Sequence, residues 1–335
     1  MTKSKFIPAG MGWIPDLPDP RDYTPDHEKV RTLVAGLKPP RQKSTPSRVD
    51  LRADDEDLSA FFSTALDQQK LNCSAVCAVL GLVEYFERRA GHTFEGSLLF
   101  LYKMARTLRR MLGDCGLDLR TTLKSLRRFG VVPYDLWYKE PERFDDIPQD
   151  ASLLGSGYAR DYQDSFYLRL DARDAIPSKG HQGPAEFAES SEQTVPVPSG
   201  SLRHVLGSQT LRNVKSFLAA GFPVAFGFPV PRSLSAESRI PYRPTFDSFH
   251  GGQAVLAVGY DDRKDTSPRG AILIRNSWGE TWGDAGYGWL PYAYVEQQLA
   301  INFWTLLRRD WIDPNEFTLP SVLRQDPHET TAESM

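Results

Sequence analysis

Two potential nucleophiles, Cys73 and Ser74, stand side by side where a buried helix is predicted to begin. Residues 74–86 are apolar almost all round, which is typical of a helix inside a protein. The N-terminus of a helix stabilises negative charge, so a thiol placed there has a lowered pKa and becomes reactive beside an imidazole. The chemistry open to this pair is therefore acyl transfer, provided that the fold supplies a general base.

Two further polar motifs lie in the second half of the chain. Gly251-Gly-Gln-Ala-Val-Leu-Ala-Val-Gly-Tyr-Asp-Asp places Gln253 at the beginning of an apolar strand. The next apolar strand leads into Asn276-Ser-Trp-Gly-Glu-Thr-Trp-Gly-Asp-Ala-Gly-Tyr-Gly-Trp. An amide has no basic lone pair near neutral pH, so Gln253 cannot act as a general base.

Apolar periodicity predicts the elements that must position these motifs. The first half of the chain is predicted to be largely helical, and the second half to consist mostly of strands. Helices followed by strands indicate an α+β protein with two lobes. Besides the buried helix, the pattern predicts helices at 97–112, 118–130 and 209–220, and strands at 165–171, 222–230, 254–260, 271–275, 287–290 and 301–307.

Three segments have the composition of regions that lie outside a core. Residues 1–48 are rich in proline and charge, and we expect them to cross the surface as an extended arm. Residues 172–207 are rich in Ser, Pro, Gly and Gln and predict a long flexible insertion. Residues 311–335 predict a polar tail. The domain between arm and tail, 49–310, divides at about residue 150 into a helical lobe and a β lobe (about 151–310).

Composition and charge set limits on the partners. A net charge of −3 gives no reason to expect nucleic acid. No run approaches the ~18–20 apolar residues of a membrane span, and no apolar leader opens the chain, so a cytoplasmic location is expected. Three cysteines without paired histidines predict neither a disulfide framework nor a metal site. No cofactor motif is present, and the oligomeric state stays open.

The three motifs together resemble the papain-like cysteine peptidases (family C1), most closely their bacterial members. The resemblance covers roughly residues 49–308, apart from the insertion, and begins at Val49-Asp-Leu-Arg. It implies the papain-like two-lobed fold, in which a helical N-terminal lobe and an antiparallel, β-barrel-like C-terminal lobe enclose a cleft. Gly113-Asp-Cys-Gly116 sits where the family has a glycine-containing loop along that cleft.

The resemblance also assigns roles, residue by residue. Gln68 corresponds to the oxyanion-binding glutamine, Asn276 to the amide that orients the catalytic imidazole, and Trp278 to the indole that shields it. The positions of the catalytic cysteine and histidine, however, are occupied by Ser74 and Gln253. The residues implied to line a ligand-binding cleft are Asp114, Cys115, Gly116, Gly252 and Trp278.

Two alternatives remain open in the sequence. Cys73 can be aligned with the catalytic cysteine at the cost of one deletion and of one insertion within the helix, which would rotate later residues by ~100°. His250 lies three residues before Gln253 and is a candidate relocated base. The 179 residues between Ser74 and Gln253 exceed the ~130–150 expected between nucleophile and histidine, and the 36-residue segment 172–207 accounts for the excess.

The sequence therefore favours a papain-like protein without peptidase activity that binds a peptide or a protein partner in its cleft. The alternative is an active cysteine-type or serine-type peptidase or acyl hydrolase that uses Cys73 or Ser74 with His250. A third hypothesis is a structural subunit that docks through the 172–207 insertion.

Overall fold

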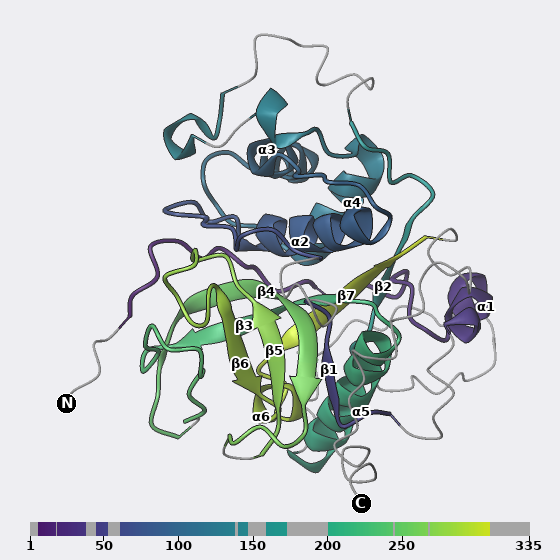
Figure 1. Ribbon diagram of the computed structural model, residues 1–335, viewed down its shortest axis with the longest axis vertical. Coiled ribbons are helices and arrows are strands. Elements are labelled where there is room, and N and C mark those ends of the chain that lie inside the picture. Colours follow the sequence, from purple (N-terminus) through teal and green to yellow (C-terminus); the bar gives the residue numbers. More distant parts are fainter. Residues whose placement is uncertain are drawn as a thin grey trace, which may run out of the picture.

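The protein has two lobes, one helical and one built on a β-sheet, as the sequence predicts (Figure 1). The computed structural model describes residues 6–17, 19–37, 45–52, 61–137, 140–146, 159–172, 200–243, 245–266 and 269–308. The predicted tail, 311–335, and most of the predicted insertion lie outside these residues.

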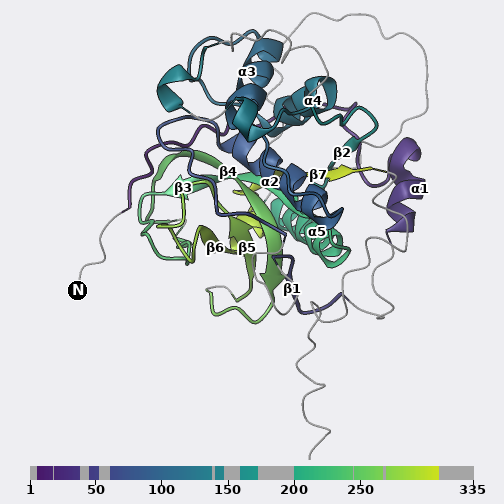
Figure 2. The same cartoon turned by 45° about the horizontal axis from the view of Figure 1, so that its top comes forward.

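The helical lobe consists of α2 (Ser74–Arg89), α3 (Leu98–Arg109) and α4 (Leu119–Phe129). Local capping explains where two of them begin, because Ser97 accepts from the Phe100 N–H and Asp118 from the Thr121 N–H. By contrast, α2 begins after Cys73 without a side-chain cap. Nearly all its residues are buried because it lies between the other two helices and the sheet (Figure 2).

The β lobe is an antiparallel sheet in the order β2-β7-β3-β4-β5-β6, with β1 paired to the far end of β4. Strand β4 is its longest, and α2 packs against it, so the residues near position 253 face the N-terminus of α2. The strands are β1 (Arg48–Asp50), β2 (Phe166–Arg169), β3 (Val224–Pro231), β4 (Phe249–Asp261), β5 (Ala271–Arg275), β6 (Tyr287–Pro291) and β7 (Ile301–Leu307).

A buried ion pair ties the two lobes together behind the cleft. Glu84 of α2 and Arg275 of β5 approach to 3.1 Å, and both side chains are almost fully buried. Arg275 also donates to the carbonyls of Ser63 and Thr64, so its guanidinium is paired and hydrogen-bonded where it is desolvated. The pair fixes the side of α2 that faces the sheet, and with it the direction in which Ser74 points.

Helices replace predicted loop in two places. Helix α5 (Gly200–Ala219) starts at Gly200, so residues 200–207 belong to a helix and not to the predicted insertion, of which 173–199 lie outside the described residues. Helix α1 (Glu28–Gly36) interrupts the predicted extended arm. Helix α1 is short and helix α5 is weakly amphipathic, so neither has an apolar periodicity that is clear in the sequence. A further short helix, α6 (Ala293–Glu296), packs against α5.

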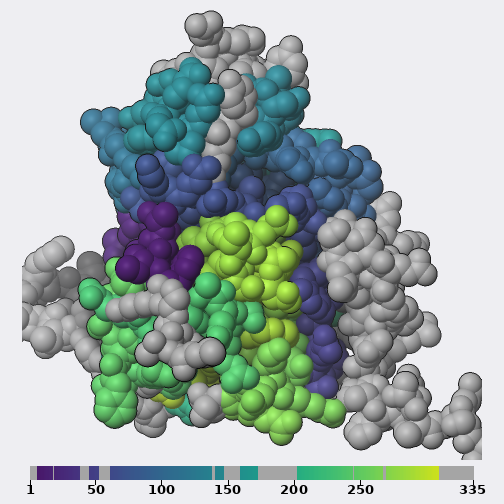
Figure 3. Space-filling model, turned by 60° about the vertical axis from the view of Figure 1, so that its left-hand side comes forward, coloured from purple at the N-terminus to yellow at the C-terminus, as the bar shows by residue number. Residues whose placement is uncertain are grey.

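The beginning of the arm does not cross the surface, and this expectation from the sequence is wrong. Figure 3 shows the purple N-terminal residues between the blue helical lobe and the green and yellow strands. Trp13, Asp16 and Asp22 are buried. Hydrogen bonds join the segment to both lobes: the Phe6 N–H donates to the Leu234 carbonyl of the β lobe, and the Leu117 N–H of the helical lobe donates to the Gly12 carbonyl. The arm therefore runs through the cleft.

Candidate functional site

Ser74 and Gln68 point their hydrogen-bond donors at one carbonyl oxygen. The Ser74 N–H, at the start of α2, donates to the Met11 carbonyl at 3.2 Å, and Nε2 of Gln68 donates to the same oxygen at 2.8 Å. A second bond from Gln68 Nε2 to the Leu71 carbonyl fixes the amide in this orientation. Two converging donors of this kind form an oxyanion hole when the carbon of that carbonyl is attacked. Here they hold a carbonyl of the chain itself.

The position opposite the nucleophile is occupied by an amide that is bonded to its neighbours. Nε2 of Gln253 donates to Oε1 of Gln68 at 3.0 Å, to Oδ1 of Asn276 at 2.9 Å and to Oγ of Ser277 at 3.2 Å. Gln253 is fully buried. Its amide thus links the residues that the resemblance assigns to the oxyanion hole and to imidazole orientation, and it offers no base to any of them.

The Ser74 hydroxyl is used in the same structural way. Its Oγ accepts a hydrogen bond from the Ala254 N–H at 3.1 Å, and the side chain is fully buried. Among the described residues, no hydrogen bond joins this hydroxyl to the side chain of Gln253 or of a histidine. A serine hydroxyl without an adjacent base is a weak nucleophile, because almost all of it is protonated. Ser74 therefore links the two lobes and is not activated.

The arm forms backbone hydrogen bonds to both walls of the cleft. On the helical side the Leu117 N–H donates to the Gly12 carbonyl at 2.9 Å, and the Ile14 N–H donates to the Leu117 carbonyl at 3.1 Å. On the β side the Trp13 N–H donates to the Gly252 carbonyl at 3.1 Å. Backbone pairing of this kind holds an extended peptide irrespective of its side chains.

Further towards the N-terminus, Trp278 holds the arm through its indole. Its Nε1 donates to the Gly10 carbonyl at 3.1 Å, and its ring packs against Phe6, with 5.4 Å between the ring centroids. The resemblance implied that this indole shields Asn276. In the structure it also serves as a hydrogen-bond donor to the polypeptide in the cleft.

Glycines make room for the arm at its closest approaches. Gly12 has φ +99, and a Cβ there would collide with the Asn72 backbone. The Trp13 indole lies on Gly227 and Gly252; at Gly252 a Cβ would come within 2.7 Å of Trp13 Cε3, and at Gly227 it would overlap the indole itself. The cleft thus accepts glycine at one position and a large flat ring at the next.

The predicted cleft loop contributes in two ways. Asp114 accepts from the Asn72 N–H at 2.9 Å and from the Tyr102 hydroxyl at 2.6 Å, so it braces the loop before α2. Burial, and secondarily this bond to Asp114, raise the pKa of Tyr102. Gly116 lies against the Gly12 carbonyl at φ +77 and must be a glycine. The half-buried Cys115 thiol donates only to its neighbour's carbonyl, at 3.7 Å.

The structure does not bring the two alternative catalytic residues to this centre. Cys73 is buried at the N-cap of α2, and its neighbour Ser74 supplies the N–H beside Gln68. His250 lies on β4 three residues from Gln253, at an irregularity in the β3–β4 pairing, where Val230 pairs with Gly251 and Pro231 with Phe249. Within the described part of the chain, no hydrogen bond joins His250 to Ser74 or Gln253.

Sequence reasoning missed the arm residues altogether. Gly10-Met-Gly-Trp, flanked by Pro8 and Pro15, has the composition of a surface turn. Gly10 and Gly12, separated by one residue and followed by Trp13, are the feature of the sequence that could have indicated a close approach between two backbone segments. A cavity beside Asn276, lined mainly by residues of α2, β4 and β5, measures about 10 Å³, room for one water molecule at most.

No group of three or more His, Cys, Asp or Glu side chains is placed to hold a metal ion in the described ranges. No described helix is long and apolar enough to cross a membrane.

Comparison with known proteins gives concordant matches. Residues 168–301 match the papain family cysteine protease profile. An uncharacterized peptidase C1-like protein of Acanthamoeba polyphaga mimivirus is 26% identical over 343 residues, which cover 98% of this chain and 94% of that protein. The crystal structure of xylellain, a cysteine protease from Xylella fastidiosa, is 25% identical with a TM-score of 0.59, covering 92% of this chain and 99% of that one.

A procathepsin B of Trypanosoma congolense shares the fold, with a TM-score of 0.58 at 16% identity, over 90% of this chain and 86% of that one. The matches to the viral protein and to xylellain each cover more than nine tenths of this chain. Such coverage cannot be reached by the β lobe alone, so the likeness extends over both lobes.

Proposed function

This chain belongs to the papain-like family of cysteine peptidases (C1), and from that premise we propose that it is a catalytically inactive member whose cleft holds an extended polypeptide. One observation carries the proposal: the donors that would stabilise an oxyanion hold the Met11 carbonyl, while an amide occupies the position of the base.

Loss of the base is the argument against catalysis. In a papain-like centre the imidazole both stabilises the thiolate and protonates the leaving amine. The Gln253 amide can do neither, and its hydrogen bonds to Gln68 and Asn276 support a structural role in place of a catalytic one. Removing one member of a catalytic unit typically costs about 10⁴–10⁶ in rate, and removing a second adds little.

The argument for binding is that the residues of the cleft that form hydrogen bonds to a peptide are still present. Gln68, Leu117, Gly252 and Trp278 all form hydrogen bonds to carbonyl or amide groups of the arm. These bonds recognise polypeptide backbone, so a peptide or a segment of a partner protein can form them in place of the arm. The arm is thus the ligand that the cleft binds within its own chain.

The test of inactivity uses the full chain and its Trp13→Ala variant, in which a weakened arm leaves the centre accessible. We expect no adduct with electrophilic probes for cysteine and serine peptidases and no cleavage of peptide substrates in either protein. A papain-like peptidase treated in parallel serves as the positive control. Labelling or turnover that disappears on Ser74→Ala or Cys73→Ala would show that the protein is an active hydrolase.

The test of binding uses a fluorescent synthetic peptide of residues 6–16. We expect it to bind the full-length Trp13→Ala variant and to bind the wild-type chain much more weakly, because the intact arm competes at high effective concentration. A matched peptide with Gly12→Ala should not bind, since its new methyl group would meet the Asn72 backbone. Binding is measured by fluorescence anisotropy. If both peptides bind equally, or if neither binds, the cleft does not recognise a polypeptide through its backbone.

A further inference from the structure

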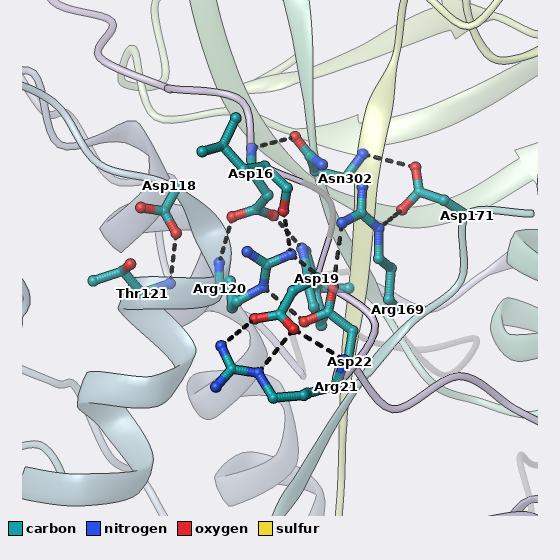
Figure 4. Close-up of polar contacts among 12 residues, drawn as sticks. Asp16, Asp19, Arg21, Asp22, Asp118, Arg120, Thr121, Arg169, Asp171 and Asn302 are labelled. Carbon is teal, nitrogen blue, oxygen red and sulfur yellow. Dashed lines mark hydrogen bonds and ion pairs between the residues drawn. The ribbon is translucent and has the colours of Figure 1, made fainter. Parts of the chain in front are cut away.

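A pair of buried carboxyl groups lies where the arm leaves the cleft. Asp16 belongs to the arm and Asp118 caps α4, and both carboxyls lie at the first turn of that helix, where Asp16 accepts from the Arg120 N–H at 3.2 Å and Asp118 from the adjacent Thr121 N–H at 2.7 Å. Their residues are only 7% and 4% exposed. Figure 4 shows the two carboxyl groups beside the start of α4, with Asp16 bonded to Arg120 and Asp118 bonded to Thr121. Two carboxylates this close together and out of water repel each other, so a proton on one of them stabilises the pair.

The partners of each carboxyl decide which one carries the proton. Asp118 accepts from the Thr121 N–H at 2.7 Å at the positive end of α4, and forms an ion pair with Arg109 at 3.1 Å. Among the described residues, Asp16 accepts from two neutral donors, the Arg120 N–H at 3.2 Å and the Trp304 indole at 2.6 Å. Asp16 is therefore the carboxyl of the pair on which a proton is favoured.

The electrostatics agree with this assignment. Burial, and then the hydrogen bond with Asp118 and its negative charge, raise the pKa of Asp16 to about 7, although Trp304 and the charge of Arg120 act in the opposite direction. Burial is the largest cause of the rise, and among the described residues no salt bridge to Asp16 offsets it.

The other charges around Asp16 are engaged with one another. Arg120 of α4 forms a two-pronged pair with Asp22 of the arm, at 2.7 and 2.6 Å. Arg169 of β2 contacts Asp22 at 3.3 Å and Asp171 at 3.1 Å, while Asp171 accepts from the Asn302 and Phe303 N–H groups of β7. Asp19 pairs with Arg21 within the arm.

The charged and polar groups around the carboxyl pair come from the arm and from four elements. They are Arg109 of α3, Arg120 of α4, Asp19, Arg21 and Asp22 of the arm, Arg169 and Asp171 at β2, and Asn302 and Trp304 of β7.

We propose that the Asp16–Asp118 pair is a proton-dependent latch, which holds the arm in the cleft while it carries a proton and loosens when the proton is lost. The latch rests on the proposed function, because it regulates access to the polypeptide-binding cleft. It also joins the lobes, since Asp16 contacts α4 through Arg120 and β7 through Trp304.

The direction of the pH dependence follows from linkage. The docked arm binds a proton on Asp16 that a released arm, with an ordinary aspartate, gives up above about pH 4. Docking is therefore strongest in acid, weakens as the pH rises towards 7, and changes little above 7, where Asp16 is ionised in both states. Across that window the opening equilibrium is expected to rise by up to about tenfold per pH unit.

Amide hydrogen exchange of the full chain measures that equilibrium. The protection factor of the arm is its exchange rate in a synthetic peptide of residues 6–17 divided by its rate in the protein, taken at each pH from 5 to 8. We expect protection to fall up to about tenfold per unit between pH 5 and 7 and then to level off. Asp16→Asn keeps the shape of the side chain but cannot titrate, so in this variant the protection factor of the arm should not change with pH. Asp19→Asn removes an equal charge from the same segment without touching Asp118, and should follow the wild type.

Asp118→Asn is a second variant, in case Asp16→Asn does not fold. It removes the repulsion from the other side while Asp16 stays buried, so protection should fall less steeply with pH than in the wild type. An unchanged slope in a folded variant of either carboxyl would overturn the latch, whatever the peptide-binding assay shows. Conversely, if Trp13→Ala never binds the 6–16 peptide at any pH, the proposed function fails even where the slope is present.

Discussion

Gly227→Ala is expected to expel the Trp13 indole from the cleft and to lower the free energy of unfolding by about 3 kcal/mol. The indole lies directly on Gly227 of β3, and an added methyl group would occupy the same space as its ring atoms. Neither side can yield, because Gly227 belongs to a paired strand and Trp13 is held by its N–H on Gly252. Thermal and denaturant unfolding measure the loss.

A double-mutant cycle identifies the cause. If the clash with Trp13 is the whole effect, Gly227→Ala should cost far less in a Trp13→Ala background than in the wild type. Gly251→Ala, on the neighbouring strand, is the matched control: its methyl group would meet only the flexible end of the Met11 side chain, at 3.0 Å, and should change stability by less than about 1 kcal/mol. Additive effects of the two substitutions would mean that Trp13 does not occupy this slot.

Restoring the catalytic pair should restore a reactive thiol, but only once the arm is weakened. Ser74→Cys with Gln253→His places a thiol at the N-terminus of α2 beside an imidazole that Asn276 can orient. Both factors lower the pKa of the thiol. With Trp13→Ala added, we expect alkylation by iodoacetamide at pH 6 to be on the order of tenfold faster than for the same chain without Gln253→His.

The arm provides the internal comparison. In the Ser74→Cys, Gln253→His chain with an intact arm, position 74 stays buried beneath the Met11 carbonyl, so its alkylation should be slow. Mass spectrometry of the labelled peptide separates this position from Cys73, Cys77 and Cys115. If Gln253→His makes no difference in the weakened-arm background, position 253 does not face position 74 in the way the hydrogen bonds of the native residues indicate.

The sequence by itself determined the fold and the motifs around Gln68, Gln253 and Asn276, including the amide at the position where the family has a histidine. These features reside in short segments, where apolar periodicity or a run of specific residue types is visible without any partner. Helix α2 is the clearest instance, since its apolar surface can only belong to a buried helix. The same reasoning located α3, α4 and the strands β2 to β7 to within a few residues.

Only the tertiary structure decided what fills the cleft and what holds it there. The arm places single residues in separate pockets and forms backbone bonds to Leu117 and Gly252, partners more than a hundred positions away, so no periodicity records its path. Such contacts depend on where the two lobes come together. For the same reason no local pattern in the sequence brings Asp16 and Asp118 together; only packing buries both at the first turn of α4.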